Sequence, residues 1–160
     1  MIRAFRAGDE DAFSALNLRW IEEYFGVEDK DRRQLDDPRA QILDRGGYIA
    51  IAELEGVVVA TGALIPASHP PAGYERWGEI IKMATVPMAQ GGGVGGEVLD
   101  HLIEQARIMQ MPGLWLETND QLEAATLLYK RKGFVELSSE DQWETPYERC
   151  NMQMTLRLDH

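Results

Sequence analysis

The segment Thr85-Val-Pro-Met-Ala-Gln-Gly-Gly-Gly-Val-Gly-Gly96 lies between a β-rich run, 80–86, and an amphipathic helical pattern, 94–109. Four of the six residues 90–95 are glycine, a composition that costs backbone entropy on folding. Without Cβ atoms, successive N–H groups can converge on an anion, and the helix N-terminus adds roughly half a positive charge. The segment therefore predicts a phosphate-binding loop, with a flexible turn as the simpler alternative.

Hydrophobic periodicity on both sides of this loop predicts strands and helices in a mixed order. The other expected strands are 2–6, 48–54, 57–65, 114–118, 134–137 and 150–158. The other expected helical segments are one that Asp9 caps, a sparsely apolar stretch over 28–45, and 121–132. The Glu55-Gly56 pair predicts a hairpin in the first half, and the second half contains a β-α-β crossover. We expect one domain over residues 1–160, with a mixed, mostly antiparallel α/β sheet and flanking helices.

Composition narrows the classes of protein to consider. The 160 residues include one cysteine, Cys150, which excludes a disulfide framework and a cysteine-rich zinc site. The three histidines lack metal-ligand spacing, so we expect no metal. The net charge of −11 argues against nucleic acid and anionic membranes as partners. No apolar run reaches the length of a bilayer span, and no signal peptide is evident, so we expect a cytoplasmic protein.

Two ligands compete for the glycine loop. Gly91-x-Gly93-x-x-Gly96 formally matches the dinucleotide fingerprint, and Glu117 follows at about the spacing of 20 residues which that fingerprint requires. Two features oppose an NAD-binding oxidoreductase. Four residues, 87–90, separate the strand from the first glycine, and only about forty residues remain after Glu117 for further parallel strands.

The second interpretation covers more of the chain. Val-Pro-x-x-Gln-Gly-x-Gly-Val-Gly over 86–95 resembles the acyl-CoA loop of the GNAT superfamily of N-acetyltransferases, whose core is Arg/Gln-x-x-Gly-x-Gly/Ala. The segment 125–134 resembles a second signature of that family, Ala-x-x-Leu-Tyr-x-x-x-Gly-Phe. Both signatures occur in order and at fitting spacing. The resemblance implies the GNAT fold and acetyl-CoA as acetyl donor.

The resemblance also implies which residues bind the donor. The strand before Pro87 should open away from its neighbour and offer backbone groups to the pantetheine arm, and the loop should hold the pyrophosphate through its N–H groups. Family members often carry an asparagine where this chain has Leu122, and Asn119 is the nearest substitute. The implied acetyl-CoA-binding residues are Met83, Thr85, Val86, Gln90, Gly91, Gly92, Gly93, Val94, Gly95 and Asn119.

Two residues are candidates for catalysis. Tyr129 matches the family tyrosine that lies near the CoA sulfur and acts as general acid, although its spacing also suits a core aromatic. Glu79, at the start of the strand that should line the cleft, is a candidate general base acting through water, although it also suits an ordinary strand-edge acid. Cys150 has no histidine neighbour in sequence, so we expect direct transfer to the amine.

The acceptor is less defined by the sequence. The resemblance implies an amine on a small molecule or peptide, and acidic residues of the expected acceptor loops would favour a cationic one; these residues are Asp36, Asp37, Glu75 and Glu144. A catalytically silent CoA-binding sensor on the same fold is the main alternative. The C-terminal strand, if it is an exposed edge, would allow a homodimer.

Overall fold

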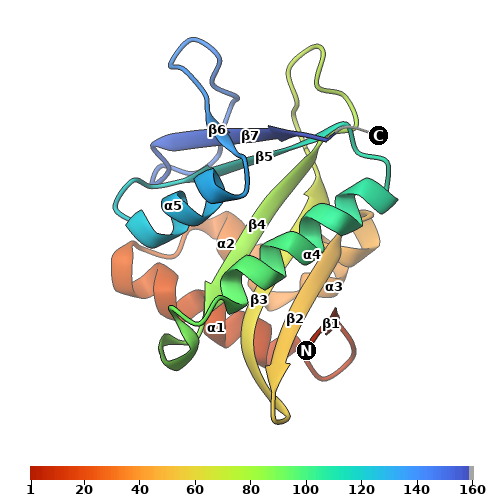
Figure 1. Cartoon of the computed structure of the whole chain (residues 1–160), viewed down its shortest axis with the longest axis vertical. Coiled ribbons are helices and arrows are strands. Elements are labelled where there is room, and N and C mark those ends of the chain that lie inside the picture. Colours follow the sequence, from red (N-terminus) through yellow and green to blue (C-terminus); the bar gives the residue numbers. More distant parts are fainter. Residues whose placement is uncertain (159–160) are drawn as a thin grey trace.

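The computed structural model describes residues 1–158, so the last two residues of the expected 1–160 domain lie outside the described range. Helices cover both faces of one seven-stranded sheet (Figure 1). The strands are β1 (Ile2–Ala4), β2 (Tyr48–Leu54), β3 (Val57–Pro66), β4 (Gly78–Thr85), β5 (Gly113–Thr118), β6 (Val135–Glu136) and β7 (Met152–Arg157). The α-helices are α1 (Glu10–Tyr24), α2 (Asp29–Asp36), α3 (Pro38–Gln41), α4 (Val94–Ile108) and α5 (Glu123–Arg131), and the 3-10 helices are η1 (Leu43–Arg45) and η2 (Pro87–Ala89).

The strand order is β1-β2-β3-β4-β5-β7-β6. Every neighbouring pair is antiparallel except β4 and β5, which run parallel because α4 crosses over between them. The β2–β3 hairpin turns at Glu55 and Gly56, whose φ angles of 52° and 79° are those of a left-handed two-residue turn. The prediction of a mixed, mostly antiparallel α/β sheet is therefore confirmed.

Each face of the sheet has its own apolar core. On one face, α4 buries Val98, Leu99, Leu102, Ile103 and Ala106, with Val94 partly buried beside them, as the amphipathic pattern over 94–109 predicts. The helix comes close to β3 because that strand has Gly62 at the contact, where a Cβ would lie 2.8 Å from Val98. On the opposite face, α1 and α2 pack on the sheet through a second core, which includes Phe13, Ile21, Leu35, Ile49 and Ile51.

The sheet opens between β4 and β5. These strands pair only at Gly78–Leu114 and Glu79–Trp115, and β5 then continues along β7 (Figure 1). On its other side, the pairing of β4 with β3 shifts by one residue next to Lys82, which forms a β-bulge. Lys82 has a φ of 53° although it is not glycine. Such a bulge increases the local twist of a strand. The edge of β4 from residue 81 to residue 85 therefore has no partner strand on the β5 side.

Two local predictions were wrong. Asp9 precedes α1 as predicted, but its side chain makes no capping bond; it accepts hydrogen bonds from the Arg3 guanidinium and the Arg6 backbone N–H instead. The C-terminal strand β7 is not an edge, because it lies between β5 and the two-residue strand β6. The edge on which a homodimer was expected is therefore covered where β6 pairs with Met154 and Thr155.

Candidate active site

A cleft of about 680 Å³ occupies the opening between β4 and β5. Its walls come from β4, the glycine loop, the C-terminal ends of α1 and β5, the residues that begin α5, and the segment 147–150. Because the strands diverge, β4 lines this space over residues 79–85. The cleft is the place where the predicted site residues should meet.

The glycine loop closes one end of this cleft. Gly91 and Gly93 have left-handed φ angles of 82° and 87°, which explains why side-chain-bearing residues are avoided there. Within residues 1–158, the N–H groups of Val94, Gly95 and Gly96 have no hydrogen-bond acceptor, because they form the first turn of α4. These N–H groups at a helix N-terminus suit an anion such as a pyrophosphate.

Side-chain contacts hold the loop in place. The Gln90 amide donates to the Thr85 carbonyl oxygen at 3.2 Å, which ties the loop to the end of β4. Behind the loop, the Lys132 ammonium bonds to Asp100 at 2.8 Å, whereas Arg131 lines the cleft. The loop therefore has two cations nearby: Arg131 in the wall of the cleft, and Lys132, whose Nζ would lie 3.7 Å from a Cβ at Gly96.

Most of the predicted donor-binding residues meet in this cleft. Those that line it are Met83, Thr85, Gln90, Gly91, Gly93, Gly95 and Asn119. Val86, Gly92 and Val94 are not among the lining residues, and the Val86 N–H donates to the Val59 carbonyl at 2.8 Å. Asn119 has its polar atoms engaged within the protein, since it accepts from the Gln121 N–H at 2.9 Å and donates to the Arg149 carbonyl at 2.6 Å.

Glu79 lies at the narrow end of the cleft, where β4 and β5 still pair. Glu79 is 4% exposed, and its carboxylate has no hydrogen-bond partner within residues 1–158. Burial raises the pKa of Glu79 to about 7; Glu117 adds to that rise, while Lys30 and Lys82 oppose it. A carboxylate that titrates near neutral pH and faces a cleft is suited to accept a proton.

Glu117 on β5 is a second carboxylate of the cleft, and the sequence patterns did not predict a catalytic role for it. Both of its carboxylate oxygens are buried without a hydrogen-bond partner in the described chain. Burial raises the pKa of Glu117, and the nearby Thr145 hydroxyl opposes that shift without reaching hydrogen-bond geometry. The signal available in the sequence was a charged residue inside the apolar run 114–118.

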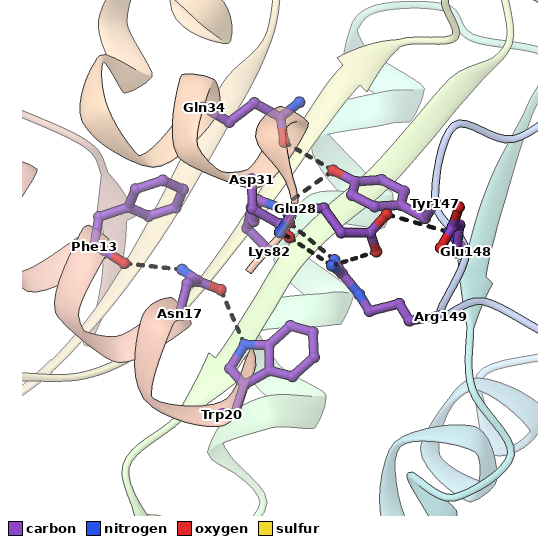
Figure 2. Close-up of polar contacts among 10 residues, drawn as sticks. All are labelled: Phe13, Asn17, Trp20, Glu28, Asp31, Gln34, Lys82, Tyr147, Glu148 and Arg149. Carbon is purple, nitrogen blue, oxygen red and sulfur yellow. Dashed lines mark hydrogen bonds and ion pairs between the residues drawn. The ribbon is translucent and has the colours of Figure 1, made fainter. Parts of the chain in front are cut away.

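A buried ion network supports the wall of the cleft next to Glu79. Lys82 donates to Asp31 at 2.6 Å, and Arg149 donates to both oxygens of the same carboxylate at 2.5 and 2.9 Å (Figure 2). The Asp31 side chain is completely buried. Burial alone would raise its pKa, but the hydrogen bonds from Arg149 and Lys82 outweigh burial and lower the pKa of Asp31 to about 2. The network thus joins α2, β4 and the segment before β7.

Tyr147 packs against this network and lines the cleft. Its ring centroid lies 4.3 Å from the Arg149 guanidinium carbon and 5.4 Å from the ammonium groups of both Lys30 and Lys82. Its hydroxyl donates to Gln34 Oε1 at 3.4 Å and accepts from Lys82 at the same distance (Figure 2). Tyr147 therefore fixes the positions of three cations with one ring.

Tyr129 and Cys150 are the remaining candidates from the sequence. Tyr129 lines the cleft at 7% exposure, and its hydroxyl has no hydrogen-bond partner within residues 1–158. Burial raises the pKa of Tyr129 to about 12, so the hydroxyl keeps its proton at neutral pH. Burial also raises the pKa of Cys150 to about 12, which leaves a thiol rather than a nucleophilic thiolate.

The comparisons with known proteins agree with this geometry. The Acetyltransferase (GNAT) family matches residues 13–134, so the chain belongs to the GNAT family of acetyltransferases. An IAA acetyltransferase of Azospirillum brasilense is 33% identical over 86 residues, which span 54% of this chain and 53% of that protein. The chain thus matches about half the length of that curated relative.

Solved structures show the same fold. A GNAT-family acetyltransferase of Staphylococcus aureus Mu50 superposes with a TM-score of 0.87 at 18% identity, covering 99% of both chains. A putative acetyltransferase from Salmonella typhimurium, solved with its cofactor acetyl-CoA, has a TM-score of 0.78 at 21% identity, covering 100% of this chain and 94% of its own. Family membership favours the acyl-CoA interpretation of the glycine loop over the dinucleotide one.

Two features are absent from residues 1–158. No helix in this range has the length and apolar character needed to cross a membrane. No three histidine, cysteine, aspartate or glutamate side chains in the same range are grouped in a way that could hold a metal ion.

Proposed function

We propose that this protein transfers the acetyl group of acetyl-CoA directly to an amine. The observation that carries this proposal is Glu79, a carboxylate that is buried, lacks a hydrogen-bond partner and has a pKa of about 7, in the cleft that the glycine loop closes. A donor lying along β4 from the loop toward Glu79 would bring its reactive end to this carboxylate. Membership of an acetyltransferase family supports the same chemistry.

The residues present fit acetyl-CoA as the donor. The N–H groups of Gly95 and Gly96 can bind the pyrophosphate, and Arg131 adds a positive charge at the same end. The edge of β4 near Met83 has no partner strand and can pair with the amides of the pantetheine arm as an added strand would, up to Thr85, whose carbonyl accepts from Gln90. We infer that Asn119 acts indirectly, by fixing the turn before α5 against Arg149.

Two residues manage protons in this proposal. Bound acetyl-CoA supplies a thioester carbonyl as the electrophile. Glu79 accepts a proton from the ammonium, directly or through one water, so that the neutral amine can form the new C–N bond. After the attack, the nitrogen of the tetrahedral intermediate loses its second proton to solvent. As the C–S bond breaks, the Tyr129 hydroxyl donates a proton to the departing sulfur and is then reprotonated from solvent. The net reaction converts thioester and ammonium into amide, free thiol and one released proton.

The surrounding charges adjust Glu79 to this task. Glu117 shares the cleft and disfavours ionisation of Glu79, whereas Lys30 and Lys82 favour it. The balance leaves the carboxylate ionised to a useful extent at neutral pH, yet basic enough to take a proton. Lys82 is held by Asp31 at 2.6 Å, so its charge is fixed at one place in the bulge of β4.

The test is the pH profile of thiol release from acetyl-CoA with a panel of primary amines. We expect kcat/KM of the unaltered protein to rise through about pH 7, beyond the rise due to the amine itself. Glu79→Gln should lower kcat about 100- to 1,000-fold and remove that component of the profile. Glu75→Gln, at an exposed loop position, is the matched control and should leave both unchanged.

Two results would count against the proposal. A Glu79→Gln variant with the rate of the unaltered protein would remove Glu79 as the base. Tight binding of acetyl-CoA with no turnover of any amine would favour the silent CoA-binding sensor instead.

A further inference from the structure

A second pocket, of about 360 Å³, lies at the far end of β4 from the glycine loop. It is enclosed by α2, the segment from α3 to η1 and the end of β3. Three cationic side chains line it, those of Lys30, Arg33 and Arg45. Their concentration around one hollow is unexpected in a chain with a net charge of −11. We therefore distinguish this basic pocket, defined by Lys30, Arg33 and Arg45, from the acyl-transfer cleft.

The three cations of the basic pocket lack acidic partners. Within residues 1–158, none of them forms an ion pair, and no aspartate or glutamate is among the residues that line the pocket. Arg33 and Arg45 are exposed and Lys30 is half-buried, so all three can turn toward an anion that enters the hollow, and no carboxylate there competes with it. The pocket therefore has the electrostatics of an oxyanion site.

A buried amide adds a specific donor to these charges. Gln34 lines the pocket and is only 5% exposed. Its Oε1 accepts from the Tyr147 hydroxyl, which leaves its Nε2 group without an acceptor in the described chain. This N–H₂ group keeps some contact with solvent, and Gln34 lines the pocket, so the group is available to donate to a ligand there. An oxyanion bound in the pocket would supply that acceptor.

The basic pocket adjoins the acyl-transfer cleft at Glu79. Ile65 of the pocket is the direct cross-strand partner of Glu79, and residues opposite one another in antiparallel strands project to the same face. Tyr147 borders both hollows, since it lines the cleft and also contacts Gln34 and Lys30 of the pocket. The charge of Lys30 also acts on Glu79, because it opposes the rise in the pKa of that carboxyl group.

We propose that the basic pocket binds an anionic group of the acceptor, so that the acceptor is an amine that also carries a carboxylate or a comparable oxyanion. This inference rests on the proposed N-acetyl transfer, because it places the amine at Glu79 and the anion a few bonds away. It keeps the amino-bearing acceptor expected from the sequence and adds an anionic group to it. The acidic residues behind that expectation, Asp36, Asp37, Glu75 and Glu144, are exposed and line neither hollow.

The kinetic test compares ω-amino carboxylates of increasing chain length with the matching ω-amino carboxamides, which are uncharged. We expect kcat/KM to favour the carboxylate by about 10- to 100-fold at the best length, mostly through KM. The double variant Arg33→Gln/Arg45→Gln should lose that preference, while its affinity for acetyl-CoA and its rate with the carboxamide stay unchanged. An ω-amino phosphonate series tells whether the pocket prefers another oxyanion.

A matched control and a binding measurement complete the test. Arg32→Gln/Arg39→Gln removes the same charge from exposed positions of α2 and α3 outside the pocket, and should keep the preference. Titration of ¹⁵N-labelled protein with γ-aminobutyrate should shift the amide signals of Ile65, Ala67 and Ser68 in the unaltered protein, but not in Arg33→Gln/Arg45→Gln. This second readout does not depend on catalysis.

The outcomes separate this inference from the proposed function. Equal turnover of carboxylates and carboxamides, or no shifts at Ile65, Ala67 and Ser68, would overturn the basic pocket as the acceptor site and leave N-acetylation standing. Shifts at these three residues without turnover of any amine would overturn both the proposed function and the assignment of this anion site to an acceptor.

Discussion

The two ends of the cleft are built in different ways. At the loop end, one continuous segment, 90–96, provides main-chain N–H groups for binding. At the acceptor end, buried charged side chains come from α2, β4 and the segment 147–149. The first construction depends on glycines at fixed positions, whereas the second depends on tertiary packing that brings Asp31, Lys82 and Arg149 together. A mutation should therefore impair donor binding at the first end and fold stability or acceptor chemistry at the second.

Asp31→Asn should produce the largest effect. It leaves Lys82 and Arg149 buried without their shared carboxylate, and the free energy of unfolding should fall by about 3–5 kcal/mol. Because the pKa of Asp31 is lowered to about 2 in the folded protein, this stabilisation is present above about pH 3.8 and is lost as the pH falls toward 2. Urea unfolding at pH 7 and pH 3 should show the difference between the two proteins shrinking in acid.

Asp100→Asn is the control for this prediction. Asp100 also pairs with a lysine, Lys132 at 2.8 Å, but its side chain is 58% exposed. Its removal should change the free energy of unfolding by about 0–1 kcal/mol. Equal losses in Asp31→Asn and Asp100→Asn would show that the buried network is not what holds the acceptor end together.

Glu79→Gln should stabilise the fold while it impairs activity. Burial raises the pKa of Glu79 from 4.5 to about 7, so the folded state disfavours the charged form by something of order 3 kcal/mol. Because its pKa is higher in the folded protein, the contribution of Glu79 to stability is fully present below about pH 4.5. That contribution is lost as the pH rises through 7. Thermal unfolding should therefore show a gain for Glu79→Gln at pH 8 and none at pH 4. A variant less stable than the unaltered protein at pH 8 would contradict this electrostatic account.

The same contrast between the two ends explains what could be predicted from the sequence. The glycine loop is a local pattern, and Glu79 and Tyr129 each stand at a recognisable place relative to it. Asp31 and Arg149 could not be predicted as site residues, because they meet only after folding, 118 positions apart. Glu117 could be recognised as an acidic residue in an apolar strand, but nothing in the sequence predicted which residues would lie next to it.

The fold shows a similar division. The hairpin turn at Glu55-Gly56 and the amphipathic stripe of α4 follow from local chemistry, and both predictions were confirmed. The position of β7 inside the sheet could not be predicted, because an alternating pattern does not tell which strands become neighbours. The Asp9 side chain failed to cap α1 because Arg3, a stronger charged partner, binds it.

Gly95→Asp tests the loop end. The substitution places a carboxylate among the N–H groups at the start of α4, and the space at Gly95 accepts a Cβ without close contact. Repulsion of the pyrophosphate should weaken acetyl-CoA binding about 100-fold in calorimetry. Gly26→Asp, at another open glycine position away from the loop, should bind as the unaltered protein does. Unchanged affinity in Gly95→Asp would mean that the loop does not hold the phosphates.

Tyr129→Phe should have the smallest effect. It removes a hydroxyl that has no hydrogen-bond partner within residues 1–158, so the fold should be retained. We expect kcat to fall about tenfold, the effect of losing one hydrogen bond or proton donor to the departing thiolate. The dissociation constant of acetyl-CoA should not change. A loss in that constant instead of in kcat would make Tyr129 a packing residue.

The central claim is direct transfer from acetyl-CoA to an amine, and mass spectrometry of a reaction with ¹³C-acetyl-CoA tests it most directly. We predict one labelled N-acetyl amide for each thiol released, with no labelled acetyl group on the protein, because Cys150 remains a thiol with a pKa of about 12. Labelled Cys150 during turnover, or thiol release without a labelled amide, would contradict the account.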